Sequence, residues 1–539
     1  MKQAHTPTIS NMASRLLISA QIDLIVFSAA FLIGLLWIIY KPEQPPLAQW
    51  SDSKTLLIYS RNMSTGQGFQ GPVPFNSENS ISPSASISPG YPVFLLLVDW
   101  LSKLSFHLEN PNDTEPISSN APMSNDGFFT SLHLTQCLLH ALCAVCVYRI
   151  AIRVFQPRSV ATLAGLLAAT HYYWIISITQ IADGLLVSFF LTGSVAIAIK
   201  VVSRPSGFGI CILGLFLGAV SLTRASLLLF TLCTTIYTVC RLSAESRKRT
   251  WILLLLGSTF LTHAPWLYRN LLLFHSGIPV STRWGLDIWW GNNSESTGGL
   301  APRIINTQSP VVDIQTGVSK LIHPYSVRGR RLRELSEPER FHSLLRESAG
   351  LFDGWIWNHP DHFLMLRIKA FVYFFTGQMF WIENNLHDLP DARFEPDRQS
   401  EIIIELPSLD LPDSPDETEI RLSDTSVQGD TGSLISETKQ TLGILPSWDP
   451  LTPWILVVFG ATSLSGLCWS HCLQEHRRLI LVTIVSVLLP AVFSYSGLLH
   501  ESRLPLDGCF LIYSALALKT CISQFGIRSF VQNTPTSRS

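Results

Sequence analysis

Charged residues are scarce in this sequence: Asp, Glu, Lys and Arg make up 14% of 539 residues, whereas a soluble protein usually carries about a quarter. An excess of one sign is also lacking, because the formal net charge is -1. The chain therefore has no basic footprint for nucleic acid. The ten cysteines all lie in or beside apolar segments, which argues against a disulfide framework. Cys137, Cys143 and Cys146 lack acidic or histidine neighbours at metal-site spacing, so we interpret them as packing residues.

Long apolar runs are abundant instead, with 47% hydrophobic residues and a mean hydropathy of +0.28. Crossing a hydrocarbon core takes about 20 mostly apolar helical residues. The sequence therefore predicts an all-α polytopic membrane protein with about ten transmembrane helices. The expected spans are residues 20–40, 128–148, 159–178, 183–201, 207–223, 225–241, 250–268, 451–470, 479–498 and 505–524.

Basic residues mark the cytoplasmic ends of short loops, and they alternate along this chain. They are Arg149, Arg153 and Arg158; Lys200 and Arg204; Arg241, Arg247, Lys248 and Arg249; and Arg477 with Arg478. This pattern places both termini in the cytoplasm and makes the polar stretches 41–127 and 269–450 two large outer loops.

Two segments bear on that topology. Residues 361–377 carry Arg367 and Lys369 in an apolar stretch, as in an amphipathic helix lying in the membrane interface. An eleventh span is the competing interpretation, and it would invert everything downstream. Residues 378–447 contain fifteen acidic and four basic side chains, which favours a poorly ordered outer insert. The expected organisation is a catalytic module over 1–377, including outer loops 41–127 and 269–377, the insert, and C-terminal helices with a tail over 448–539.

The loop after the first span carries a specific set of residues. Asp52 is followed nine and ten residues later by Arg61-Asn62, then by Gly66-Gln-Gly68-Phe69, and Pro89-Gly90-Tyr91-Pro92 opens an apolar helix. In these features the chain resembles the GT-C superfamily of polyprenyl-phosphate-dependent glycosyltransferases, in the branch related to protein O-mannosyltransferases and the lipid A aminoarabinose transferase. Leu56 departs from the family pattern, which has Tyr there, and Ser60 stands where Ala is usual.

The resemblance continues along most of the chain, except in the acidic insert. Similar segments are Ile178-Thr-Gln-Ile-Ala-Asp183, Leu222-Thr223-Arg224, Pro265-Trp266-Leu-Tyr-Arg269-Asn270, Pro279-Val-Ser-Thr282, Trp290-Gly291-Asn292-Asn293, His359-Pro360 with Lys369, and Arg503-Leu-Pro505. The resemblance implies a GT-C-like fold and transfer of a sugar from a polyprenyl-phosphate donor to a lipid, glycan or protein acceptor. It also implies a multi-pass protein, of the bacterial inner membrane, with its active site on the non-cytoplasmic face.

Two carboxylates are the candidate catalytic groups. Partial burial beside a membrane pocket raises a carboxyl pKa toward the working range of a general base, and Asp52 is the candidate for that role. Its alternative is a solvated loop residue or a helix cap. Asp183 lies between two apolar segments, where an ionisable side chain is costly and marks a functional site by default; its alternative is an N-cap. The two groups are compatible with a shared divalent metal and with metal-free catalysis.

Four cations are candidates for holding the donor phosphate: Arg224, Arg269, Lys369 and Arg503. The arginine fork suits phosphate oxygens and lysine acts as a point charge. Their alternative role is snorkelling to the interface. Candidates for lining the substrate pocket are Arg61, Tyr91, Trp266, Trp290 and Asn292. The alternatives are an ion pair for Arg61 and membrane anchoring for the aromatic side chains. Glycines 66, 68, 90 and 291 are expected to be turn residues with positive φ.

A transporter is the rival class, since it too places charges within a helical bundle, but we find no paired broken helices or inverted repeats. A catalytically silent membrane scaffold is the other alternative, because Leu56 departs from the family pattern.

Overall fold

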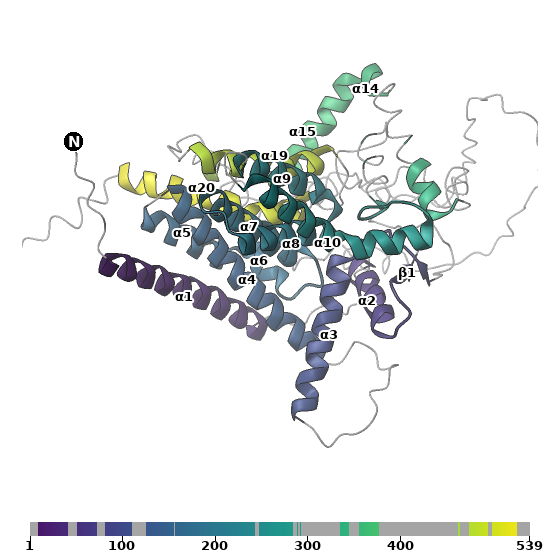
Figure 1. The fold of residues 1–539 in the computed structure, drawn as a ribbon, viewed down its shortest axis with the longest axis horizontal. Coiled ribbons are helices and arrows are strands. Elements are labelled where there is room, and N and C mark those ends of the chain that lie inside the picture. Colours follow the sequence, from purple (N-terminus) through teal and green to yellow (C-terminus); the bar gives the residue numbers. More distant parts are fainter. Residues whose placement is uncertain are drawn as a thin grey trace, which may run out of the picture. The chain divides into compact units, whose positions relative to one another are not determined.

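Helices make up most of the part of the chain that the computed structural model describes (Figure 1). Contacts divide the chain into two units, residues 1–380 with 450–539 and residues 381–449, and every described element belongs to the first. The described residues are 9–40, 51–72, 81–109, 126–155, 157–242, 247–283, 288, 292, 335–343, 346, 355–376, 462–463, 474–493 and 499–524.

The bundle is built from apolar helices of different lengths that pack side by side (Figure 1). They are α1 (Ile9–Tyr40), α4 (Asp126–Phe155), α5 (Arg158–Ala169), α6 (Tyr172–Ser177), α7 (Gly184–Ser203), α8 (Gly207–Thr223), α9 (Leu228–Leu242), α10 (Lys248–Phe274), α19 (Gln474–Phe493) and α20 (Leu499–Gln524). A single 3-10 turn, η2 (Ala225–Leu227), joins α8 to α9.

Within the described residues, five helical segments are long and apolar enough to cross a membrane: Ala20–Tyr40, Gly127–Phe155, Gly184–Ser203, Ala225–Leu242 and Lys248–Phe274. Ten spans are therefore not confirmed. Three further predicted spans are shorter apolar helices, Arg158–Ala169, Gly207–Thr223 and Arg478–Phe493. The predicted span 505–524 forms the greater part of α20, and most of 451–470 lies outside the described residues.

The predicted span 159–178 is interrupted between Ala169 and Tyr172. Helix α5 ends at Ala169, and His171 adopts extended backbone angles before the chain starts α6. The His171 ring meets Asp507 of α20, with Nε2 3.3 Å from Oδ2. The sequence pattern alone shows one apolar run here, because this break depends on a partner more than 300 residues away.

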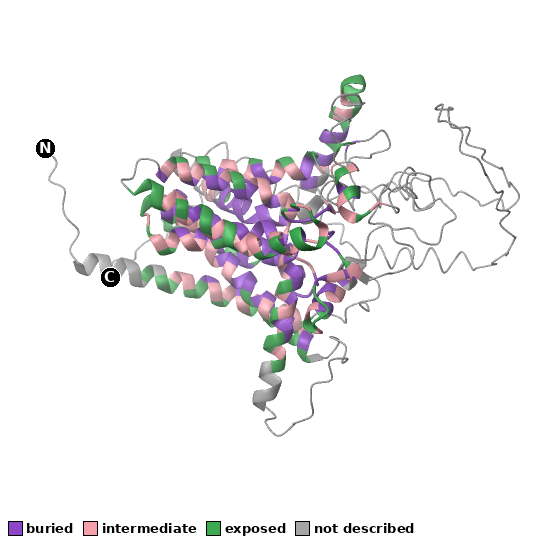
Figure 2. Ribbon diagram, turned by 45° about the vertical axis from the view of Figure 1, so that its right-hand side comes forward, coloured by how far each residue is buried: buried purple, intermediate pink, exposed green. Residues whose placement is uncertain are grey.

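The outer faces of the helices are apolar as well as the inner ones. Figure 2 shows buried residues gathered on the inward faces and exposed residues on the outside of the bundle. On α1, Leu24 is 64% exposed and Ile39 is 72% exposed. Contiguous apolar surface of this kind is unusual on a soluble protein and is expected where lipid is the solvent. The chain is an integral membrane protein.

The polar stretch after α1 is structured. It contains α2 (Ser51–Ser64), a two-stranded antiparallel hairpin of β1 (Gln70–Pro72) and β2 (Ile81–Pro83), and α3 (Gly90–Glu109). Gly71 pairs with Ser82 in the hairpin, and a Cβ at Gly71 would lie 2.2 Å from the Tyr59 ring. Two further helices, α14 (Trp355–Asn358) and α15 (Pro360–Thr376), precede the C-terminal part. Helix α15 packs on α19 and α20, and whether it crosses the membrane stays a prediction.

The expectation for the glycines is confirmed at two positions and wrong at a third. Gly66 and Gly68 have φ of 77° and 81°, so they form the predicted turn. Gly90 has no positive φ; instead, a Cβ there would lie 2.6 Å from the Thr223 Cα. Gly90 is needed for close approach of α3 to the end of α8. Gly291 lies outside the described residues.

Candidate functional site

The central feature of the candidate site is an ion pair between Asp183 and Arg224. Arg224 Nε donates to Asp183 Oδ2 at 2.9 Å, and its Nη2 donates to Oδ1, so the guanidinium holds both carboxylate oxygens. Asp183 occupies the N-cap position of α7, but its side chain makes no capping hydrogen bond. Bidentate pairing is the geometry that fixes an arginine most firmly. The two sequence candidates are thus first of all partners of each other.

Tyr91 lies beside this ion pair. Its side chain is buried close to Ala182 and Asp183, and its hydroxyl makes no hydrogen bond within the described part of the chain. Burial raises the pKa of the Tyr91 hydroxyl, and the negative charge of Asp183 raises it further, so the group stays protonated at neutral pH. The tight contact between Gly90 and Thr223 holds α3 against the residue that precedes Arg224. A neutral donor therefore stands next to a charged pair.

The candidates Asp52 on α2 and Arg503 on α20 lie next to residues that contact the segment around Asp183. Ser53 Oγ donates to the Ile181 carbonyl at 3.0 Å, which sets the residue after Asp52 two residues from Asp183. Leu504 packs on the other side, where a Cβ at Gly184 would lie 2.8 Å from it. The side chains of Asp52 and Arg503 themselves lie outside the described part of the structure. We call Asp183, Arg224 and Tyr91, with the segments carrying Asp52 and Arg503, the Asp183 cluster.

Arg269 belongs to a second group of contacts at the end of α10. It donates to the Phe69 carbonyl at 2.7 Å and to Asn270 Oδ1 at 2.8 Å. Its guanidinium also lies over the Trp266 ring, 4.7 Å from the centroid, and over the Phe69 ring at 5.3 Å. Phe69 and Trp266 contact each other edge to face. These contacts clamp the turn after α2 onto α10, and we call this group the Arg269 clamp.

Residues after α10 complete the clamp. Trp266 Nε1 donates to the Val280 carbonyl at 2.7 Å. Glu337 Oε1 accepts from both the Ala85 amide and the Thr282 hydroxyl at 2.8 Å. Tyr59 is fully buried, and burial raises the pKa of its hydroxyl. Three stretches far apart in the sequence are thereby joined by hydrogen bonds.

Leu222 connects the two groups of contacts. It packs in one apolar cluster with Tyr59, Phe69 and Trp266 of the clamp, and it lies two residues before Arg224. Leu222 therefore packs the end of α8, just before Arg224, against the clamp.

The remaining candidates are not part of either group. Arg61 on α2 and Lys369 on α15 are exposed, and neither forms an ion pair with another described residue. Asn292 is buried and donates to the Phe493 carbonyl at 2.7 Å, so it caps the end of α19. Arg367 donates to the adjacent Val492 carbonyl. Trp290 lies outside the described residues.

Sequence reasoning missed the contact between the His171 ring and the Asp507 carboxylate. Both side chains are buried among the helices, 8% and 0% exposed. The Trp174 ring lies 5.4 Å from the His171 ring, and its Nε1 donates to the Leu504 carbonyl at 3.3 Å. This pair therefore fixes the first turns of α20 against α6. An aspartate within the predicted span 505–524 was the signal that could have pointed to it.

A divalent metal at Asp183 would have to compete with Arg224. Both carboxylate oxygens accept from the guanidinium, so a metal ligand at this position requires that one of these bonds be given up. Among the described residues, no group of three His, Cys, Asp or Glu side chains has the arrangement of a metal site.

Comparison with known proteins gives a distant structural likeness. No family model matches the chain, and no curated protein matches it. Two crystal structures of an Archaeoglobus fulgidus oligosaccharyltransferase resemble it at 11% identity, the apo form with a TM-score of 0.43 and a form tethered to an acceptor peptide containing the NVT sequon with 0.42. The matches cover 96% of this chain and 52% and 51% of those chains, so the chain spans about half their length. A likeness at this level assigns neither a family nor a function.

Proposed function

We propose that this chain is a membrane glycosyltransferase that takes a sugar from a polyprenyl-phosphate donor on the non-cytoplasmic face of a membrane. The observation that carries the proposal is the meeting of Asp183, Arg224 and Tyr91 with the segments that bear Asp52 and Arg503. These residues come from five separate parts of the sequence, and each was a candidate for the same chemistry. Loss of the phosphate leaving group needs a cation, and attack by a hydroxyl needs a base.

In this proposal Asp52 is the general base and Asp183 orients Arg224. A bidentate carboxylate fixes the plane of the guanidinium, so that Arg224 presents a preorganised positive charge to the developing phosphate dianion. Arg503, which directly precedes Leu504 beside Gly184, is the second phosphate ligand. Tyr91, kept protonated by burial, donates to the sugar or the acceptor. Catalysis in this form requires no metal.

The Arg269 clamp has a supporting role in the same reaction. Its hydrogen bonds and ring contacts favour a function in holding the turn after α2, and so the helix that carries Asp52. Direct contact between Arg269 and the donor phosphate stays a prediction, as it does for Lys369.

The test is transfer from polyprenyl-phosphate sugar donors by the purified full-length protein in lipid vesicles. Asp52→Asn should abolish transfer without changing the unfolding temperature, because it removes the base and keeps the shape. Asp361→Asn, an exposed carboxylate on α15, is the matched control and should transfer normally. Full transfer by Asp52→Asn would remove Asp52 from the mechanism. Absence of any transfer or donor hydrolysis by the wild-type protein, across donors with different sugars, would overturn the function.

One observation favours a transporter as a second candidate. The buried His171–Asp507 pair places two ionisable groups among the helices, and such groups commonly serve proton relays in transporters. A proton-coupled transporter should acidify the interior of proteoliposomes when a substrate gradient is applied, and His171→Gln should stop it. A glycosyltransferase should move no protons in this assay, and His171→Gln should alter only its stability.

A further inference from the structure

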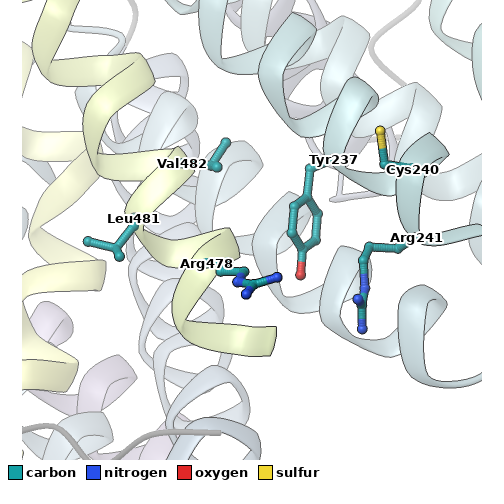
Figure 3. Close-up of a pocket in the computed structure, with 6 residues that line it drawn as sticks. All are labelled: Tyr237, Cys240, Arg241, Arg478, Leu481 and Val482. Atoms are coloured by element: carbon teal, nitrogen blue, oxygen red, sulfur yellow. The ribbon is translucent and has the colours of Figure 1, made fainter. Parts of the chain in front are cut away.

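A cleft between α9 and α19 lies far from the Asp183 cluster. It has a volume of about 560 Å³ and is lined by Tyr237, Cys240, Arg241, Arg478, Leu481 and Val482 (Figure 3). Arg241 lies in the last turn of α9, whereas Arg224 precedes that helix. Arg241 is 17 positions after Arg224, which corresponds to about 25 Å at the helical rise, so the two sites lie near opposite ends of α9.

The entrance of this cleft is basic. Arg241 comes from α9 and Arg478 from the first turns of α19, and Figure 3 shows the Arg478 side chain extending toward the Tyr237 ring. Among the described residues that line the cleft, none is acidic. The flanking stretches 240–249 and 474–478 contain six Lys or Arg and two Glu. Two arginines converging from different helices suit the oxygens of a phosphate group.

Above the arginines, both walls continue as rows of apolar side chains. On α9, Ile236 and Leu232 lie one and two turns before Cys240 and are 52% and 54% exposed. On α19, Leu481 is followed by Val485 and Leu489, 50% and 42% exposed. Residues four apart lie on one face of a helix, so each row runs along its helix from the cleft into the apolar part of the bundle surface.

We propose that this cleft binds an anionic membrane phospholipid, with its phosphate between Arg241 and Arg478 and an acyl chain along the two apolar rows. A soluble phosphate compound would use the cations but not the rows, and a second copy of this chain would need no phosphate. Basic pockets between transmembrane helices commonly hold anionic headgroups. The combination of a cationic end and an exposed apolar track along both helices selects a lipid.

The experiment is native mass spectrometry of the full-length protein titrated with phosphatidylglycerol or phosphatidylcholine in detergent. Wild-type protein should retain phosphatidylglycerol more strongly. Arg241→Gln and Arg478→Gln should each weaken it about fivefold, since a cation near a headgroup contributes about 1 kcal/mol. Arg247→Gln with Arg249→Gln is the matched control: it removes two neighbouring charges that do not line the cleft and should change retention little. Val485→Gln should weaken retention through the apolar track alone.

Four outcomes would overturn the proposal. They are equal retention of the two lipids by the wild-type protein, an equal loss in the control variant, full displacement by soluble glycerol 3-phosphate at millimolar concentration, and an unchanged affinity in Val485→Gln. Unfolding temperatures of all variants, measured in the same detergent, show whether each variant is folded, and Arg241→Lys replaces Arg241→Gln if that variant is not. None of these readouts depends on glycosyl transfer.

Discussion

Replacing Arg224 with Gln should destabilise the protein by more than the loss of a surface cation, because Asp183 would lose the guanidinium that holds both of its oxygens while only 22% exposed. Exposed ion pairs contribute about 0 to 1 kcal/mol, and breaking a fully buried pair costs about 3 to 5 kcal/mol. Arg224 is 18% exposed, so this ion pair lies between the two limits. We expect about 2 to 3 kcal/mol for Arg224→Gln or for Asp183→Asn.

A double-mutant cycle separates the ion pair from other effects. The free energy of unfolding is measured by denaturant titration in mixed micelles for wild type, both single variants and the double variant. The double variant should lose less than the sum of the single losses, by about 1 to 2 kcal/mol, because neither charge is left alone. The Asp99–Lys103 pair on α3, whose lysine is 43% exposed, is the control and should show about 0.3 to 0.5 kcal/mol. Additivity of the Asp183 and Arg224 losses within about 0.5 kcal/mol would refute this reasoning.

Three further predictions concern packing around the candidate site. Gly90→Ala should lower the unfolding free energy by about 1 to 3 kcal/mol and reduce transfer, because the new Cβ would lie 2.6 Å from the Thr223 Cα. Gly257→Ala is the control: Gly257 has open space around it, so this variant should be neutral in the same measurements. Arg269→Ala should expose the turn after α2 to protease, and unchanged cleavage rates would show that the clamp does not hold it. His171→Gln should lower the unfolding free energy by about 3 to 5 kcal/mol because it leaves the buried Asp507 carboxylate without its partner. In a denaturant titration, adding Asp507→Asn to this variant should restore part of that free energy. No recovery would exclude a charge interaction between the two side chains.

The sequence by itself predicted the features that depend on interactions between residues adjacent in the chain. Apolar runs of about 20 residues predicted the long helices α4, α7 and α10. The start of α3 at Gly90 and the turn at Gly66 and Gly68 were also anticipated, since a proline before a helix and glycines in a short polar stretch act on the local backbone. Charge scarcity predicted a membrane protein, and the exposed apolar faces of the helices agree with it.

Only the tertiary structure decided which side chains meet. Asp183 was weighed as an N-cap or a catalytic residue, and only the structure shows that its carboxylate pairs with Arg224, 41 residues away; its catalytic role stays a prediction. Gly90 was expected in a turn with positive φ, whereas in the structure the absence of a side chain lets it pack directly against Thr223. Arg269 was assigned to phosphate, and packing gives it Phe69 and Trp266 as neighbours. Helical period and hydropathy report the conformation of adjacent residues, whereas ion pairs and close contacts are fixed by how distant helices pack, which no local pattern encodes.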